Sequence, residues 1–138
     1  MAYKIKRKRC SDSDVKLPIE QVVYVPTTNK YQKPIKKKEI IKRVNETEKY
    51  MSEKFGGFTQ TEGEGGFVSG IGKTKGKLIR EDVIKVTSFT TKENYKKNKA
   101  SFFQKLRKDG KKWGQESIGY EHEGDLTYLK SENGEIIK

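Results

Sequence analysis

Hydrophobic residues recur at helical spacing along residues 36–55. Polar and charged residues fill most of the positions between them. Four apolar residues lie four or seven positions apart, which places them on one face of a helix: Ile40, Val44, Met51 and Phe55. Gly56-Gly57 predicts the end of this helix, because glycine readily adopts the left-handed conformation that closes a helix.

A second amphipathic helix is predicted to follow Thr90. Thr90 is a favourable N-cap, and Glu93 three residues later completes a capping box. Lysines cover most of the helix circumference, whereas three apolar residues share one face: Tyr95, Phe102 and Leu106. Gly110 is predicted to end or break the helix.

Segments rich in β-branched and aromatic residues predict the strands of a sheet. The first four cover residues 21–26, 58–72, 77–89 and 117–122. A turn at residues 123–125 then allows residues 126–129 to pair back as a short additional strand. Five glycines between Gly63 and Gly72 indicate bulges or a wide turn in the second segment.

The order of these elements predicts an α+β fold of the ferredoxin-like kind, a split βαβ sandwich with the order β-α-β-β-α-β. Both helices are expected on one face of an antiparallel sheet. A single domain is predicted at residues 21–130, between a basic N-terminal arm at residues 1–20 and a C-terminal tail at residues 131–138. The open sheet face predicts RNA binding or self-association into a homo-oligomer.

Positive charge is concentrated in two parts of the chain. The formal net charge is +12, and nine basic residues lie between residues 92 and 112 while five lie in the first ten positions. Such asymmetry favours a polyanionic partner, so we predict binding of DNA or RNA without strong sequence preference. The predicted contacts are Lys4, Lys6, Arg7, Lys8, Arg9, Lys96, Lys97, Arg107, Lys108, Lys111, Lys112 and Trp113.

Two other interpretations of this pattern stay open. A lysine-rich surface also serves solubility, and a sole tryptophan beside a helix end is typical of a core residue. The basic helix would equally suit an acidic protein surface, as in a viral or mobile-element interaction module that acts as a structural component or an inhibitor. Salt-sensitive binding to unrelated oligonucleotides distinguishes the nucleic-acid prediction from both.

No catalytic or metal-binding motif of standard spacing occurs in the sequence. One cysteine and one histidine exclude the usual zinc sites. Gly72-Lys73-Thr74 lacks the first glycine of a phosphate-binding P-loop, because Phe67 stands at that position. We therefore predict a protein that is not an enzyme and has no cofactor and no metal.

The alternative is an enzyme that uses His122 and Glu116 as catalytic groups. Alternation along a strand places His122 on the same face as Tyr120 and separates it from its two flanking glutamates. Gln115, Glu116 and Ser117 are also typical of a junction whose side chains satisfy exposed backbone groups.

Two short motifs carry a family resemblance. Residues 114–118, Gly-Gln-Glu-Ser-Ile, and residues 76–81, Gly-Lys-Leu-Ile-Arg-Glu, resemble a family of small uncharacterised bacterial proteins with a Gln-Glu-Ser motif after the second helix. The similarity covers about residues 20–130, and the chain departs from it at Trp113-Gly114, in its extra lysines and in its basic arm. That family has no established activity, so the resemblance implies a fold and no function.

The sequence contains no apolar run near the roughly 18 residues that a membrane span requires. Polar residues follow the basic N-terminus, where a signal peptide would need an apolar core. We expect a cytoplasmic protein, or a nuclear one in a eukaryotic host, with no membrane partner.

Overall fold

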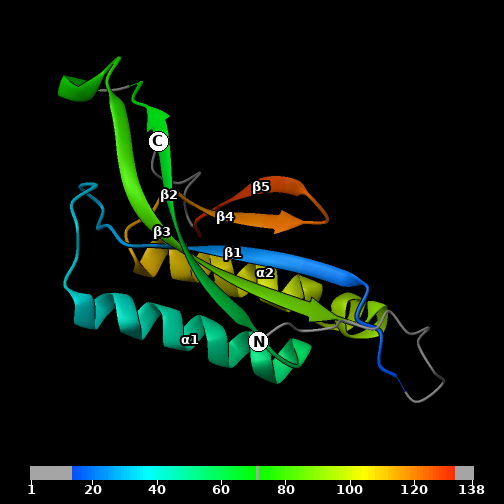
Figure 1. The fold of residues 1–138 in the computed structure, drawn as a ribbon. Coiled ribbons are helices and arrows are strands. Elements are labelled where there is room, and N and C mark those ends of the chain that lie inside the picture. Colours follow the sequence, from blue (N-terminus) through cyan, green and yellow to red (C-terminus); the bar gives the residue numbers. More distant parts are fainter. Residues whose placement is uncertain (1–13, 71, 133–138) are drawn as a thin grey trace, which may run out of the picture.

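The computed structural model describes residues 14–70 and 72–132, which form one sheet and two long helices (Figure 1). In chain order the elements are β1 (Ile19–Pro26), α1 (Lys37–Phe55), β2 (Thr59–Val68), the 3-10 turn η1 (Gly72–Thr74), β3 (Leu78–Thr90), α2 (Lys92–Lys112), β4 (Ser117–His122) and β5 (Asp125–Lys130).

The sheet has the strand order β2-β3-β1-β4-β5, and every neighbouring pair is antiparallel. Strands β1 and β2 are therefore parallel with β3 between them, and β3 and β4 are parallel with β1 between them. Each pair is joined by one helix, and both helices cover the same face of the sheet (Figure 1). This confirms the predicted ferredoxin-like sandwich, to which β5 adds an edge strand.

The core lies between this sheet face and the two helices. Val23 stands opposite Val86 on one neighbouring strand and opposite Tyr120 on the other. The helices contribute the apolar residues that the periodicity predicted. The fully buried side chains from α1 and α2 in this cluster are Met51, Phe55, Phe102 and Leu106. Helical periodicity thus identified the inner face of both helices.

The end of α1 is as predicted. Gly56 has a φ of 101°, and its N–H donates to the carbonyl oxygen of Ser52 at 3.0 Å. A residue with a side chain would be strained in this left-handed conformation, so glycine closes the helix.

The predicted start of α2 is wrong by one residue. Thr91 is the N-cap, and its Oγ1 accepts a hydrogen bond from the N–H of Asn94 at 3.1 Å. Thr90 is instead the last residue of β3, where it pairs with Ile19 and is fully buried. The β1–β3 ladder continues one residue further than the capping pattern indicated.

The prediction that Gly110 ends α2 is also wrong, because the helix continues to Lys112. A Cβ at Gly110 would lie 2.2 Å from Ser131 Oγ, so glycine is needed here for close approach of the chain beyond β5. The turn comes later, at Gly114, whose φ is 69°. A glycine in a helical pattern does not by itself distinguish a helix end from a packing contact.

The hairpin of β2 and β3 extends beyond the rest of the sheet (Figure 1). Pairing of β1 with β3 ends at Pro26 and Val83, whereas β2 pairs with β3 as far as Leu78. Residues 78–82 of β3 therefore have a strand neighbour on one side only. This two-stranded extension forms one wall of the cleft described below.

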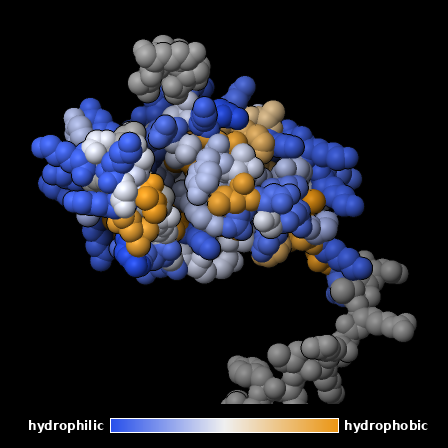
Figure 2. Space-filling view, turned by 90° about the horizontal axis from the view of Figure 1, so that it is seen from above, coloured by the Kyte–Doolittle hydropathy of each residue, from blue (hydrophilic) through white to orange (hydrophobic). Residues whose placement is uncertain are grey.

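The sheet face opposite the helices is mixed in polarity, because strand alternation places the exposed Phe89, Leu126 and Tyr128 on it beside polar residues. Figure 2 shows that side of the molecule, where hydrophobic atoms lie in separate areas between hydrophilic ones. In the part of the chain that the structure describes, no helix is long and apolar enough to cross a membrane.

Candidate functional site

A cleft of about 850 Å³ lies between the β2–β3 hairpin and the N-terminal half of α1. The loop between β1 and α1 closes one side of it through Thr27 and Thr28. Side chains from α1 and β3 give it an apolar floor: Ile40, Ile41, Val44 and Ile84. This volume falls within the range of about 300–1,000 Å³ that is typical of small-molecule sites.

Acidic side chains outnumber basic ones around this cleft. Its lining contains two basic residues, Lys37 and Arg80. It contains four acids, all from the hairpin: Glu62, Glu64, Glu81 and Asp82. A locally acidic cleft in a chain with a net charge of +12 is the reverse of the overall charge distribution.

Two of these carboxylates stand directly opposite each other. Glu64 pairs with Asp82 in the register of β2 and β3, so both side chains project from the same face of the hairpin. Like charges at directly opposite positions of an antiparallel pair are destabilising. The guanidinium of Arg80 contacts the Glu64 carboxylate at 2.8 Å and offsets part of this repulsion.

The remaining acids differ in their partners. Glu81 accepts a hydrogen bond from Thr28 Oγ1 at 3.1 Å, which ties the loop to β3. Within residues 14–70 and 72–132, no hydrogen bond or ion pair engages the carboxylates of Glu62 and Asp82. Both side chains are solvent-exposed, so their negative charge is free to attract a cation.

A buried arginine fixes the loop that borders the cleft. Arg43 on α1 is 4% exposed, and its Nη1 donates to the carbonyl oxygens of Pro26 at 2.9 Å and Thr28 at 3.0 Å. Burial lowers the pKa of this guanidinium, and its position 5.4 Å from the Trp113 ring centroid adds a cation–π contact. The amide nitrogen of Gln115 also donates to the Thr28 carbonyl, at 2.8 Å.

The acids of the cleft do not form a recognisable metal site. In the described residues, no group of three or more His, Cys, Asp or Glu side chains is arranged to hold a metal ion. The carboxylates follow the length of the hairpin rather than converging on one point. This arrangement suits an extended organic cation better than a single ion.

The residues predicted to bind nucleic acid differ in their exposure and in their partners. Lys96, Lys97, Lys108 and Lys111 are exposed on α2. Lys112 pairs with Glu46 at 3.1 Å, and Arg107 donates to the carbonyl oxygen of Lys130. Trp113 is only 4% exposed, so it is a core residue and cannot stack on bases. The predicted arm contacts lie outside the described residues: Lys4, Lys6, Arg7, Lys8 and Arg9.

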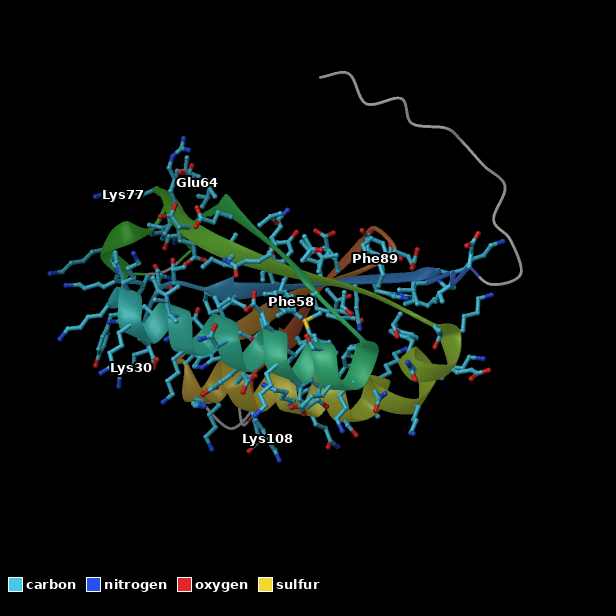
Figure 3. All side chains as sticks on the ribbon, turned by 60° about the horizontal axis from the view of Figure 1, so that its bottom comes forward. Lys30, Phe58, Glu64, Lys77, Phe89 and Lys108 are labelled. Carbon is cyan, nitrogen blue, oxygen red and sulfur yellow. The ribbon has the colours of Figure 1, made fainter. Side chains whose placement is uncertain are left out.

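Figure 3 shows how the basic helix and the acidic hairpin are separated. Lys108 projects from α2 on the side away from the sheet, whereas Glu64 and Lys77 lie on the protruding hairpin. The predicted basic surface and the cleft are therefore different parts of the molecule.

The structure does not bring together His122 and Glu116, the catalytic groups of the alternative enzyme interpretation. The ring of His122 stacks on Tyr95 with centroids 4.6 Å apart, and Glu116 is exposed just before β4. Six residues of extended chain span roughly 20 Å, so the two groups cannot act on one reacting atom. Gln115 has the structural role that the junction indicated, because it donates to the carbonyl oxygens of Thr28 and Trp113.

Sequence reasoning missed the acidic cleft. Glu62 and Glu64 are two positions apart, as are Arg80 and Asp82, which is the spacing of side chains on one face of a strand. The five glycines between Gly63 and Gly72 were interpreted as a sign of bulges or a wide turn. Period-two alternation of charged residues on both arms of a hairpin was the available signal.

No protein-family model matches this chain, and no curated protein is similar to it in sequence. Two solved structures are similar in fold. A phage SAM lyase in complex with S-methyl-5'-thioadenosine has a TM-score of 0.54 and 15% sequence identity, over 82% of this chain and 89% of that chain. The phage SAM lyase in its apo state has a TM-score of 0.52 and 15% identity, over 83% and 90%.

These comparisons overturn the predictions made from charge. Both similar structures are of an enzyme, and one holds a small nucleoside ligand. On that finding we correct two predictions: that the partner is a nucleic acid or an acidic protein, and that the protein is not an enzyme. At 15% identity the similarity itself establishes the fold alone.

Proposed function

We propose that this protein is a lyase that binds S-adenosylmethionine (SAM) in the cleft between α1 and the β2–β3 hairpin. The observation that carries the proposal is the set of free carboxylates above an apolar floor, in a chain that is otherwise strongly basic. The similarity in fold to a phage SAM lyase supports it.

The chemistry of the ligand matches the lining of the cleft. SAM carries a positive sulfonium, which the carboxylates of Glu62 and Asp82 would attract. Its adenine ring is flat and largely apolar, and the side chains of Ile40, Val44 and Ile84 offer a surface for it. Side-chain amides of Asn45 and Gln60, which also line the cleft, can hydrogen-bond to the ring edge or the ribose.

The difference between SAM and S-methyl-5'-thioadenosine is one bond, which joins sulfur to the γ-carbon of the amino-acid tail. When it breaks, the electron pair stays on sulfur, and the sulfonium becomes a neutral thioether. Either the carboxylate of the tail attacks the γ-carbon as this bond breaks and forms a lactone, or a cleft carboxylate takes a proton from the β-carbon and a double bond forms between the β- and γ-carbons. Both reactions account for every atom and charge of SAM without water or another reactant.

The acidic cleft distinguishes substrate from product. A carboxylate attracts the sulfonium of SAM but has no net charge to attract in the thioether. Negative charge therefore recruits the substrate and favours release of the nucleoside product. It cannot by itself accelerate the bond cleavage, because catalysis requires interactions that are stronger in the transition state than in the ground state.

The direct test is to incubate the purified protein with SAM and measure S-methyl-5'-thioadenosine by liquid chromatography. Isothermal titration calorimetry with both compounds measures binding separately from turnover. We expect Asp82→Asn and Glu62→Gln each to weaken SAM binding about tenfold, since each removes a charged partner. Lys108→Gln, a change on the far side of α2, should have no effect. Wild-type protein that neither binds SAM nor releases the product would refute the proposal.

A further inference from the structure

The protruding end of the hairpin presents its charged side chains in a fixed order. Along β3, Arg80, Asp82 and Ile84 alternate on one face and lie about 7 Å apart from one to the next. Across the ladder, Glu64 stands opposite Asp82, and Glu62 stands opposite Ile84. From the tip inward, the face therefore offers a cation, then two carboxylates, then a carboxylate beside an apolar residue.

The polar groups of SAM follow the same order along its length. Its tail ends in a carboxylate and an ammonium group on one carbon, followed by the sulfonium and then the nucleoside. We infer that Arg80, Glu64 and Asp82 form a subsite for the α-amino-acid tail, which orients the nucleoside toward α1. This inference rests on the proposed function and adds to it the residues that select the zwitterionic tail.

Arg80 is suited to this role because its present partner holds it weakly. The side chains of Arg80 and Glu64 are 68% and 55% exposed, and ion pairs exposed to this degree are worth little. A guanidinium can donate two parallel hydrogen bonds to the tail carboxylate, which is stronger than its single 2.8 Å contact with Glu64. Glu64, released from that contact, and Asp82 then lie on the side where the tail ammonium would stand.

Three ligands separate the subsite from the rest of the cleft. SAM has the complete tail, its decarboxylated form lacks only the carboxylate, and S-methyl-5'-thioadenosine lacks the tail. We expect Arg80→Met to weaken SAM binding about 10- to 100-fold, by loss of a charge-assisted contact, and not to weaken binding of the other two ligands. Asp82→Asn should weaken both tailed ligands and spare S-methyl-5'-thioadenosine.

Lys77→Met is the matched control. It removes one exposed positive charge from the same hairpin, near its end (Figure 3), but from a residue that does not line the cleft. We expect it to leave all three affinities unchanged. Circular dichroism of each variant establishes that the hairpin and the fold are retained.

The outcomes distinguish the two proposals. If wild-type protein binds S-methyl-5'-thioadenosine and SAM but Arg80→Met weakens SAM and its decarboxylated form equally, or neither, the amino-acid subsite is overturned and the proposed function stands. If wild-type protein binds none of the three ligands, the proposed function fails and this inference fails with it. If Arg80→Met selectively loses affinity for SAM, the result supports both the proposed function and the amino-acid subsite.

Discussion

At the scale of single residues, Gly110 shows how one missing side chain shapes the packing. Its Cα faces Ser131, and a Cβ there would also lie 3.3 Å from a side-chain carbon of Ile118. Gly110→Ala should therefore lower the free energy of unfolding by about 1–3 kcal/mol through overpacking, although alanine favours a helix. Urea denaturation measures this.

The same substitution in a Ser131→Gly background provides the control. Removing the Ser131 side chain opens the space that the new methyl group needs. The penalty for Gly110→Ala should then shrink, because the higher helix propensity of alanine offsets what remains of the steric cost. An equal penalty in both backgrounds would contradict the steric explanation.

Tyr24 gives a prediction about alkaline pH. Burial, followed by the hydrogen bond that its hydroxyl donates to Glu121, raises the pKa of Tyr24 from 10.0 to about 12. A raised pKa in the folded state means that this group's contribution to stability is complete below pH 10 and is lost as the pH rises through about 12.

Ultraviolet titration of tyrosinate measures this shift. The difference between the titrations of wild type and Tyr24→Phe isolates one tyrosine, which should ionise near pH 12. Glu121→Gln should lower the pKa toward 10, because it removes a negative charge beside the hydroxyl. A difference curve centred at pH 10 in wild type would show that the contact with Glu121 does not form in solution.

At the scale of elements, Arg43 connects α1 with the loop that follows β1. Arg43→Met keeps the aliphatic bulk but leaves the buried carbonyl oxygens of Pro26 and Thr28 without this donor. We expect a loss of about 2–4 kcal/mol in unfolding free energy, since buried unpaired polar groups are costly. Denaturation with urea measures the loss, and hydrogen exchange should show faster exchange in residues 27–35.

Lys42→Met is the control for this prediction. Lys42 precedes Arg43 on the same helix, but its side chain is exposed. It should change the unfolding free energy by less than about 0.5 kcal/mol. Equal effects at the two positions would mean that the buried guanidinium does not hold the loop.

The elements themselves were largely predictable from the sequence, as was the end of α1 at Gly56, whereas both ends of α2 were not. Helical spacing of Val44, Met51 and Phe55 requires only that one helix face be apolar, and this face is buried. The N-cap of α2 depends instead on how far β1 pairs with β3, which is a contact between distant segments. The need for glycine at position 110 likewise depends on a contact with a distant segment, the close approach of Ser131.

The site was missed for a related reason. Glu64 and Asp82 become neighbours only through the register of β2 and β3, and the cleft exists only because α1 lies beneath their hairpin. Net charge, in contrast, is visible in the sequence, and it directed the prediction to α2. Charge sums over the whole surface, whereas a binding site depends on the few charges that the fold brings together.

At the scale of the whole molecule, the net charge of +12 and the acidic cleft act on a cationic ligand in opposite directions. The cleft lining contains two basic residues and four acids, Glu62 and Asp82 among them, so the net positive charge comes from residues outside the lining. Screening lengths are about 30 Å at 0.01 M salt, about 10 Å at 0.1 M and about 3 Å at 1 M. Salt therefore screens the distant repulsion before it screens the nearby attraction.

The affinity for SAM, whose net charge is +1 at neutral pH, should consequently pass through a maximum near 0.1 M salt. It should rise from 0.01 M to about 0.1 M as the repulsion is screened, and then fall toward 1 M as the cleft carboxylates are screened in turn. Uncharged S-methyl-5'-thioadenosine should bind with nearly the same affinity throughout. Calorimetric titrations at four or five salt concentrations measure both curves. Asp82→Asn should reduce the loss of SAM affinity between about 0.1 M and 1 M salt. If the affinity of the wild type instead falls steadily from the lowest salt concentration, the positive charges outside the cleft do not oppose the ligand.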